Sequence, residues 1–279
     1  SMRRRFNNIV LFLMVAVLTV IGFSGMFRSA KAEAEGLPFA SGGAEFALRG
    51  KFYTSYGGST EERKHNIALA AAAIDGTLIE PGGQFSFNFV VGERTAARGY
   101  LPAKIIFNGQ FTDGIGGGVC QVSSTVYNAA LLAGMKISEY HPHSLPVSYV
   151  APSFDAMVNS AGSDLRFENE TALPVYIRAE ADGERLTISV FGEKTDRRFV
   201  RESRTVEVIP APPEIVTEDD RGEYPDLPAG EIRVISYSKE GLKSMGILSE
   251  YKGERLVSRK VIRKDTYQPL QGTAVRGCA

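Results

Sequence analysis

The segment at residues 114–134, with the sequence GIGGGVCQVSSTVYNAALLAG, places the strongest constraint on the fold. Its three consecutive glycines allow positive φ angles and close backbone approach, so they predict a tight turn. A helix is expected to follow over residues 120–133 and to end at Gly134, because apolar residues recur there at helical spacing. The predicted buried stripe of that helix comprises Val122, Val126, Ala129, Ala130 and Ala133. Cys120 therefore stands at or beside a helix N-terminus.

Shorter patterns on both sides predict a second helix and several strands. Ser59 followed by Glu62 is a capping-box pattern, and Gly76 closes the helix that this pattern begins. Alternating apolar residues flank Asp182 and Gly183, which is typical of a β-hairpin with a tight turn. Strands are predicted at residues 85–87, 146–150, 175–179 and 186–190. The expected fold class is α+β, with the Cys120 helix packed on an antiparallel sheet.

The character of the sequence changes near residue 200. Pro210, Pro212 and Pro213 precede a group of acidic residues, which indicates a surface connection. Short alternating runs follow, separated by glycines and without a helical pattern. We therefore predict a mixed domain at residues 36–198 and a small all-β module at residues 203–279.

Residues 1–34 have the pattern of an export signal. Three arginines at positions 3–5 precede an almost purely apolar run at residues 9–23, and Ala-x-Ala patterns follow at residues 30–34. Either the segment is a cleaved signal peptide, or it is retained as an anchor, because the apolar stretch is just long enough to span a bilayer. Both readings place the rest of the chain outside the cytoplasmic membrane.

The charge balance and the scarcity of ligand residues exclude several functions. The chain has 32 basic and 32 acidic residues, which argues against a nucleic-acid partner. Its two cysteines and three histidines match no common zinc spacing, so no metal site is expected. There is no glycine motif of the phosphate-binding or dinucleotide-binding type, and no cofactor is predicted.

The surroundings of Cys120 suit a reactive thiol. A helix N-terminus carries a partial positive charge of about +0.5, which favours the thiolate that acts as nucleophile. The N–H groups at Gly117 and Gly118 are candidates for an oxyanion hole. Alternatively, the glycines form only a tight turn into the helix. A separate alternative is that Cys120 pairs with Cys278 as a disulfide. If it does not, Cys278 is a free thiol in the tail.

Two histidines follow the Cys120 helix closely enough to reach back to it. His141 and His143 are separated by Pro142, so their rings are expected to point in different directions. Either ring is a candidate base for the Cys120 thiol. His65 lies within the first predicted helix and is expected to be a surface residue.

Four long motifs occur in an order and spacing that resemble the VanW family. They are PGGQFSFNFVVGERTAARGY, GIGGGVCQVSSTVYNAALLAG, HPHSLPVSYVAPSFDAMV and DLRFENETALPVYI, and the resemblance covers about residues 50–195. Met157 departs from the threonine that the family usually has at this position. The downstream module resembles, more weakly, the glycine-patterned G-five domain, over residues 227–277.

The resemblance implies an L,D-transpeptidase that cross-links peptidoglycan stem peptides. The cysteine of the family falls on Cys120, its histidine on His143 and its aspartate on Asp155. His141 remains the alternative base. Arg94 is a candidate ligand for a substrate carboxylate, because arginine binds carboxylates in a bidentate manner, or else it forms a structural ion pair. Ser123, one turn into the helix, is a further candidate for substrate contact, or else it caps the helix.

Two other functions also agree with the sequence. The protein is alternatively a non-catalytic wall-binding or assembly protein, with Cys120 buried and the β-module holding glycan strands. It is alternatively a cysteine peptidase or amidase that cuts stem peptides, because transpeptidation and hydrolysis differ only in whether an amine or water accepts the acyl group. The expected partners are stem peptides, glycan strands through the module and, if the N-terminal segment is retained, the membrane.

Overall fold

In a computed structural model of the chain, the described residues are 40–41, 44–107 and 109–278. They form mostly antiparallel sheets with few helices, which confirms an α+β class at that level. Residues 1–47 and residues 48–279 make two compact units. The described part of the first contains β1 (Ala40–Ser41), paired antiparallel with the beginning of β2 (Ala44–Ser55).

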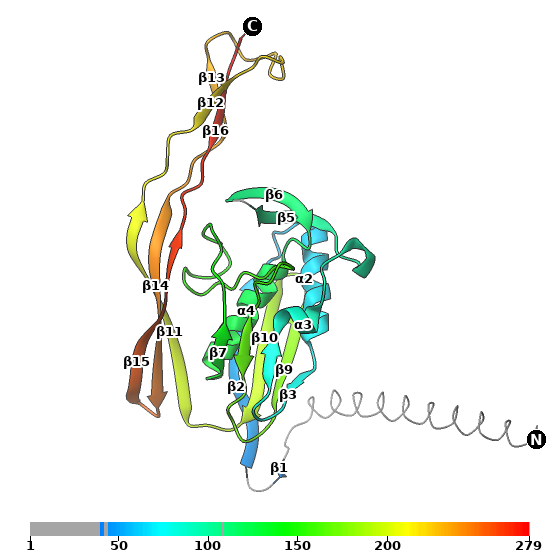
Figure 1. Cartoon of the computed structure of the whole chain (residues 1–279), viewed down its shortest axis with the longest axis vertical. Coiled ribbons are helices and arrows are strands. Elements are labelled where there is room, and N and C mark those ends of the chain that lie inside the picture. Colours follow the sequence, from blue (N-terminus) through cyan, green and yellow to red (C-terminus); the bar gives the residue numbers. More distant parts are fainter. Residues whose placement is uncertain (1–39, 42–43, 108, 279) are drawn as a thin grey trace, which may run out of the picture. The chain divides into compact units, whose positions relative to one another are not determined.

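The centre of residues 48–279 is an antiparallel sheet with two helices against it (Figure 1). α2 packs on β9, α4 packs on β10, and the two helices contact each other, so both lie on the same face. The predicted hairpin is formed by β9 and β10, with Leu186 opposite Ala181. The helices are α2 (Glu61–Ile74) and α4 (Val119–Leu132), and the strands, in spatial order, are β2, β10 (Arg185–Glu193), β9 (Val175–Ala181) and β3 (Thr77–Ile79).

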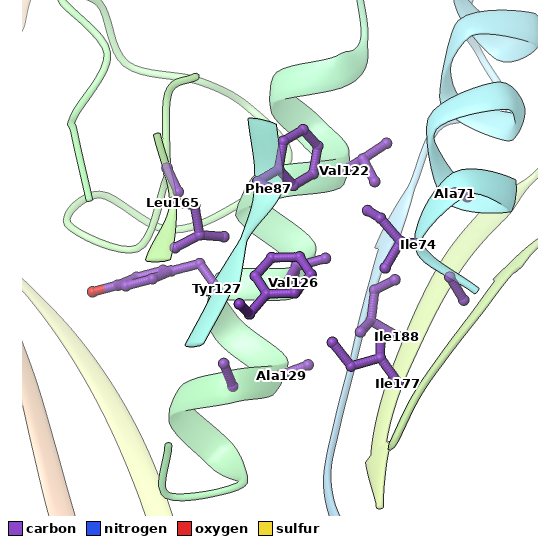
Figure 2. Packing of buried hydrophobic residues seen from close by; sticks show 14 of the residues in the cluster. Ala71, Ile74, Phe87, Val122, Val126, Tyr127, Ala129, Leu165, Ile177 and Ile188 are labelled. Atoms are coloured by element: carbon purple, nitrogen blue, oxygen red, sulfur yellow. The ribbon is translucent and has the colours of Figure 1, made fainter. Parts of the chain in front are cut away.

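The hydrophobic core lies between this sheet and the two helices (Figure 2). Ile74 of α2 and Val126 of α4 are both fully buried, as are Ile177 of β9 and Ile188 of β10. Burying an aliphatic side chain of this size stabilises the folded state by about 1.5–3 kcal/mol. Because α4 contributes several such side chains, its packing on the sheet fixes where the helix lies. The predicted stripe of α4 is buried as expected, but burial extends around the whole helix and includes its polar residues.

Smaller elements surround the core and lead into the glycine turn. A hairpin, β5 and β6, ends directly before Gly116. A three-stranded sheet has the order β4-β8-β7, and a short helix and a 3-10 turn connect β4 to β5. These elements are β4 (Gln84–Ser86), α3 (Phe87–Val91), η1 (Ala96–Arg98), β5 (Pro102–Phe107), β6 (Gln110–Ile115), β7 (Lys136–Glu139) and β8 (Arg166–Glu168).

The residues that follow β10 form two three-stranded sheets. The first has the order β11-β14-β15 and is antiparallel. In the second, β16 pairs in parallel with β12 and antiparallel with β13. The short alternating runs of the predicted all-β module, at residues 205–208, 232–235 and 256–262, lie within β11, β13 and β15. The six strands are β11 (Arg197–Ile209), β12 (Ile215–Glu218), β13 (Ile232–Ser236), β14 (Gly241–Lys252), β15 (Arg255–Tyr267) and β16 (Thr273–Arg276).

Three local predictions were wrong. The cap of α2 is Thr60, whose side chain accepts from the Arg63 N–H, whereas the Ser59 hydroxyl accepts from the Arg63 guanidinium. Phe87 begins α3 because the Ser86 hydroxyl caps that helix, so β4 ends one residue early. Residues 146–150 form no strand and instead run as irregular chain.

The predicted export signal at residues 1–34 lies outside the described residues and stays a prediction. The longest helices that the structure describes, α2 and α4, have 14 residues each. None of the described helices is long and apolar enough to cross a membrane.

Candidate active site

Cys120 is the second residue of α4, and Gly118 occupies the N-cap position of that helix. Gly118 has a φ of 107°, in the left-handed region that side-chain-bearing residues rarely adopt. A Cβ atom at this position would lie 3.0 Å from Cγ of Arg63 and 3.0 Å from Cγ1 of Ile67. The glycine turn is therefore required both by its backbone conformation and by the close approach of α4 to α2.

Asn66 of α2 holds the glycine turn in place. Its amide Nδ2 donates to the backbone oxygens of Gly117 and Leu101, each at 2.9 Å, and its Oδ1 accepts from the Leu101 N–H at 2.8 Å. The side chain is fully buried, so these bonds are shielded from competing water. The start of α4 is thus fixed before any substrate arrives.

The polar residues of α4 bind the loop that follows β7. Ser123 donates to the Ala156 carbonyl at 2.5 Å, and the Ala156 N–H donates to the Ser124 hydroxyl at 2.9 Å. Asn128 donates to the Phe154 carbonyl at 2.7 Å. These contacts account for the burial of the two serines and Asn128, whereas Gln121 and Thr125 of the same helix hydrogen-bond Thr54 of β2. The contacts with Ala156 and Phe154 place the backbone on both sides of Asp155 directly against the helix.

His143 lies between Asp155 and Cys120. Its Nδ1 is 2.7 Å from Oδ2 of Asp155, and its backbone N–H donates to the same oxygen at 2.7 Å. The His143 imidazole also interacts with the thiol of Cys120, through a hydrogen bond and through charge, and this interaction shifts the pKa of both groups. Sγ of Cys120 also lies 3.4 Å from the Val158 carbonyl oxygen. The imidazole and the carboxylate are buried, whereas Cys120 is half-buried.

The electrostatics favour a charged pair at this site. Burial raises the pKa of the Cys120 thiol, but the hydrogen bond and positive charge of His143 and the charge of Arg94 outweigh burial, and the net pKa is lowered. Burial lowers the pKa of His143, but its hydrogen bonds to Asp155 and Cys120 raise it to about 9. Both shifts favour a thiolate beside an imidazolium, a pair whose protons titrate together.

The second oxygen of Asp155 is held by strand β15. The Tyr267 hydroxyl donates to Oδ1, and Arg263 reaches the same oxygen with Nη2 at 3.2 Å. Arg263 also donates through Nη1 to the Asp155 backbone oxygen at 2.6 Å. Burial raises the pKa of the Asp155 carboxyl, but His143, Arg263 and Tyr267 together lower it below its usual value. Asp155 is therefore a carboxylate with both oxygens occupied.

Two arginines flank the glycine turn, and neither has a carboxylate within salt-bridge distance in the described part of the chain, although the charge of Asp164 acts on Arg94. Arg94 donates to Asn88 Oδ1 at 2.8 Å and to the Gly92 carbonyl at 3.0 Å. Arg63 donates to Ser59 and to Gln121, each at 2.8 Å. All four acceptors are neutral, and both side chains are half-buried. Burial lowers the pKa of each guanidinium, and a Cys120 thiolate opposes that change.

The remaining sequence-predicted residues lie away from the thiol or are already engaged. His141 points to Glu139, with Nε2 at 2.9 Å from Oε1. Ser123 does not cap α4 and has no exposed surface for a substrate, because it is fully buried and donates to backbone oxygens. The Gly117 carbonyl accepts from Asn66. The disulfide alternative was wrong, because Cys120 and Cys278 are both free.

Sequence reasoning missed four residues that lie close to Cys120, His143 or Asp155 in the folded chain. Tyr149 places its ring edge-on to His143, with centroids 6.5 Å apart, within the segment wrongly predicted as a strand. Arg63 had no local motif, and its position beside Cys120 depends on the packing of α2 on α4. Arg263 and Tyr267 are more than one hundred residues from His143 and Asp155 in sequence, and no pattern in the sequence connects them.

Residues 62–191 match the family model described as VanW like protein. The region of the chain that matches this family, residues 62–191, is its VanW-like domain. YoaR of Bacillus subtilis (strain 168), whose name is given as uncharacterized protein, is 44% identical over 142 residues, or 51% of this chain and 47% of YoaR. The vancomycin B-type resistance protein VanW of Enterococcus faecalis (strain ATCC 700802 / V583) is 30% identical over 139 residues, or 48% of this chain and 50% of that protein. The chain spans about half the length of both relatives.

Two solved structures are similar to 29% of this chain. They are the G5 domain of an IgA1 protease, at 23% identity with a TM-score of 0.19, and HP0197-G5, at 18% identity with a TM-score of 0.16. The match covers 90% and 99% of those chains, respectively. The scores are too low to carry an argument about the fold, so the G-five character of the module downstream of the VanW domain stays a prediction.

Proposed function

We propose that this protein is a cell-wall-associated L,D-transpeptidase that forms 3→3 cross-links through a thioester on Cys120. The observation that carries the proposal is the arrangement of three side chains, in which Asp155 Oδ2 binds His143 Nδ1 and His143 hydrogen-bonds the Cys120 thiol. A thiolate held in this way is a nucleophile for acyl transfer. The VanW domain and the name of the resistance protein VanW support an association with the cell wall.

The first half-reaction transfers an acyl group to Cys120. The thiolate attacks the carbonyl carbon of the third residue of a tetrapeptide stem, and a C–S bond forms. The tetrahedral intermediate collapses as the C–N bond to the terminal D-alanine breaks, and His143 gives its proton to the leaving amine. D-alanine departs and a thioester on Cys120 remains.

The second half-reaction transfers the acyl group to an amine on another stem. His143, now neutral, takes a proton from the attacking amine as the new C–N bond forms. The C–S bond then breaks and the thiolate returns. Asp155 binds Nδ1 of the imidazole, which leaves Nε2 as the nitrogen that exchanges the proton with the thiol and the amine.

The negative charge of each tetrahedral intermediate needs donors close to Cys120. The N–H groups of Val119 and Gln121 already donate to Gly116 and Gly118. We assign the oxyanion to the neighbouring N–H groups of Gly118 and Cys120, which lie at the positive end of α4. Because Asn66 fixes this turn, the donors need no rearrangement during the reaction.

The reaction itself is tested with purified protein and a disaccharide-tetrapeptide substrate. A transpeptidase is expected to release D-alanine and to produce a cross-linked dimer that mass spectrometry identifies as 3→3. Release of D-alanine with a tripeptide and no dimer would show a hydrolase, which is the second candidate because water is an alternative acceptor for the same thioester. No product of either kind would favour a wall-binding protein.

We further propose that Arg94, together with Arg63, binds the terminal carboxylate of the donor stem. Replacing Arg94 with glutamine is expected to lower kcat/KM by about 10-fold, because a hydrogen bond to a charged group is lost. The measurement is steady-state D-alanine release. A donor amidated at its C-terminus provides the control, since it lacks the carboxylate and should be used equally poorly by both proteins. Equal loss on the acid and amide donors would refute the assignment.

A further inference from the structure

Asp155 is the point at which the VanW domain meets the strands that follow it. The family match ends at residue 191, whereas Arg263 and Tyr267 belong to β15 (Arg255–Tyr267). Tyr267 and the side chain of Arg263 are almost completely buried, as is Asp155 itself. Three hydrogen bonds from these two residues end on Asp155, two on its carboxylate and one on its backbone oxygen.

Two ion pairs and a ring contact of Arg263 fix the geometry at this junction. Arg263 lies between two carboxylates, because its Nε donates to Asp265 Oδ2 at 2.6 Å while Nη2 reaches Asp155. Its guanidinium also stacks over Tyr140, 4.5 Å from the ring centroid. A buried carboxylate that lost such partners would be left partly unsatisfied, at a substantial energetic cost. The arrangement therefore holds the Asp155 side chain in a single orientation.

The backbone just before Asp155 is held from the same sheet. Ser153 has a φ of 62°, an uncommon value for a residue other than glycine. Its N–H donates to the Tyr267 hydroxyl at 2.8 Å, and its hydroxyl lies 2.6 Å from the hydroxyl of Ser244 in β14 (Gly241–Lys252). Tyr267 thus contacts both the strained turn and the carboxylate that follows it.

We propose that Tyr267 and Arg263 are positioning residues, which orient Asp155 so that its other oxygen holds His143 against Cys120. The sheet β11-β14-β15 is then a structural part of the reactive site, and not only an attachment for the wall. The inference rests on the proposed Cys120–His143–Asp155 site, but it does not depend on which acyl acceptor the enzyme uses. A change at Tyr267 in β15 would therefore reach the thiol through three successive hydrogen bonds, which join Tyr267 to Asp155, Asp155 to His143 and His143 to Cys120.

The test compares Tyr267→Phe with Ser244→Ala in the full chain, both in a Cys278→Ser background so that Cys120 is the single thiol. Each substitution removes one hydrogen bond from the sheet to Ser153, but only Tyr267→Phe also removes a donor from Asp155. The first readout is the pH dependence of Cys120 alkylation by iodoacetamide. The second is kcat for D-alanine release, and the unfolding temperature is recorded for both variants.

Tyr267→Phe is expected to move the alkylation midpoint upward by about one pH unit, because a less well held Asp155 supports the His143 imidazolium less well. It is also expected to lower kcat by about 10-fold. Ser244→Ala should change neither the midpoint nor kcat, even if its unfolding temperature falls as much as that of Tyr267→Phe. The same midpoint in both variants would overturn the proposal and leave Tyr267 with a purely structural role.

The two readouts also separate this inference from the proposed function. Alkylation needs no peptidoglycan, so a shifted midpoint in a protein that releases no D-alanine would retain the positioning role and refute the transpeptidase. If the enzyme forms the cross-linked dimer but the alkylation midpoint is unshifted in Tyr267→Phe, the transpeptidase is retained and the positioning role is refuted.

Discussion

Replacing Cys120 with alanine is expected to lower the rate of D-alanine release by about 10⁴-fold or more, because no acyl-enzyme can form. Alanine is smaller than cysteine and helix-favouring, so α4 should keep its packing and the variant should fold. The measurement combines steady-state turnover with the intact mass of protein quenched during reaction. The wild type should carry the mass of the acyl group, and the Cys120→Ala variant should not.

A Cys278→Ser variant provides the matched control for this experiment. Cys278 is exposed near the end of β16, and its thiol lies 3.6 Å from a carboxylate oxygen of Glu218. Partial desolvation of the thiol, together with the nearby Glu218 carboxylate, raises its pKa, so this thiol is the less reactive of the two. Its removal should leave both turnover and the acyl adduct unchanged. Turnover that survived in Cys120→Ala would exclude the thioester mechanism.

Replacing His143 with glutamine is expected to produce the second largest effect. Because the hydrogen bond and charge of His143 lower the pKa of Cys120, their loss should raise the alkylation midpoint to about 8.5 or higher, the range of an ordinary thiol or above. Turnover should fall by about 10²–10⁴-fold, since the leaving amine also loses its proton donor. Both quantities are measured in the Cys278→Ser background.

The pH profile of the wild type gives an independent check on the same residue. The pKa of His143 is raised to about 9, so the imidazolium persists through neutral pH and is lost as the pH rises through that value. The pKa of Cys120 is lowered, so its thiolate persists to a more acidic pH than a free thiol would. Acyl transfer to Cys120 should therefore have an alkaline limb near pH 9 that is absent from His143→Gln.

His141→Gln separates the two candidate bases of the HPH sequence. His141 is paired with Glu139, and its ring is more exposed than that of His143. This variant should keep the wild-type alkylation midpoint and turnover. If the alkylation midpoint shifted as much in His141→Gln as in His143→Gln, the contact between His143 and Asp155 would not control the pKa of the Cys120 thiol.

Local patterns were enough to predict the helix that bears Cys120 and the hairpin of β9 and β10. In both cases the periodicity of apolar residues agrees with short-range signals, namely the glycine turn before α4 and Asp182-Gly183 between the strands. The same reasoning failed at residues 146–150, where apolar alternation is present but the segment folds as a loop. It also placed the cap of α2 at Ser59, although the neighbouring Thr60 makes the capping bond.

The sequence by itself determined that Cys120 lies at the start of a helix with a buried stripe, and that the histidines nearest to it in sequence follow that helix. The residues themselves left the choice between His141 and His143 open, and only the resemblance to the VanW family favoured His143. The choice depends on which ring faces Asp155, and the contacts of α4 with the loop hold Asp155 in place. The sequence contained no sign of Arg263 and Tyr267, because hydrogen bonds between residues this far apart in sequence follow no periodicity. Only the tertiary structure, which packs β15 against the loop, brings their side chains to the carboxylate that holds His143.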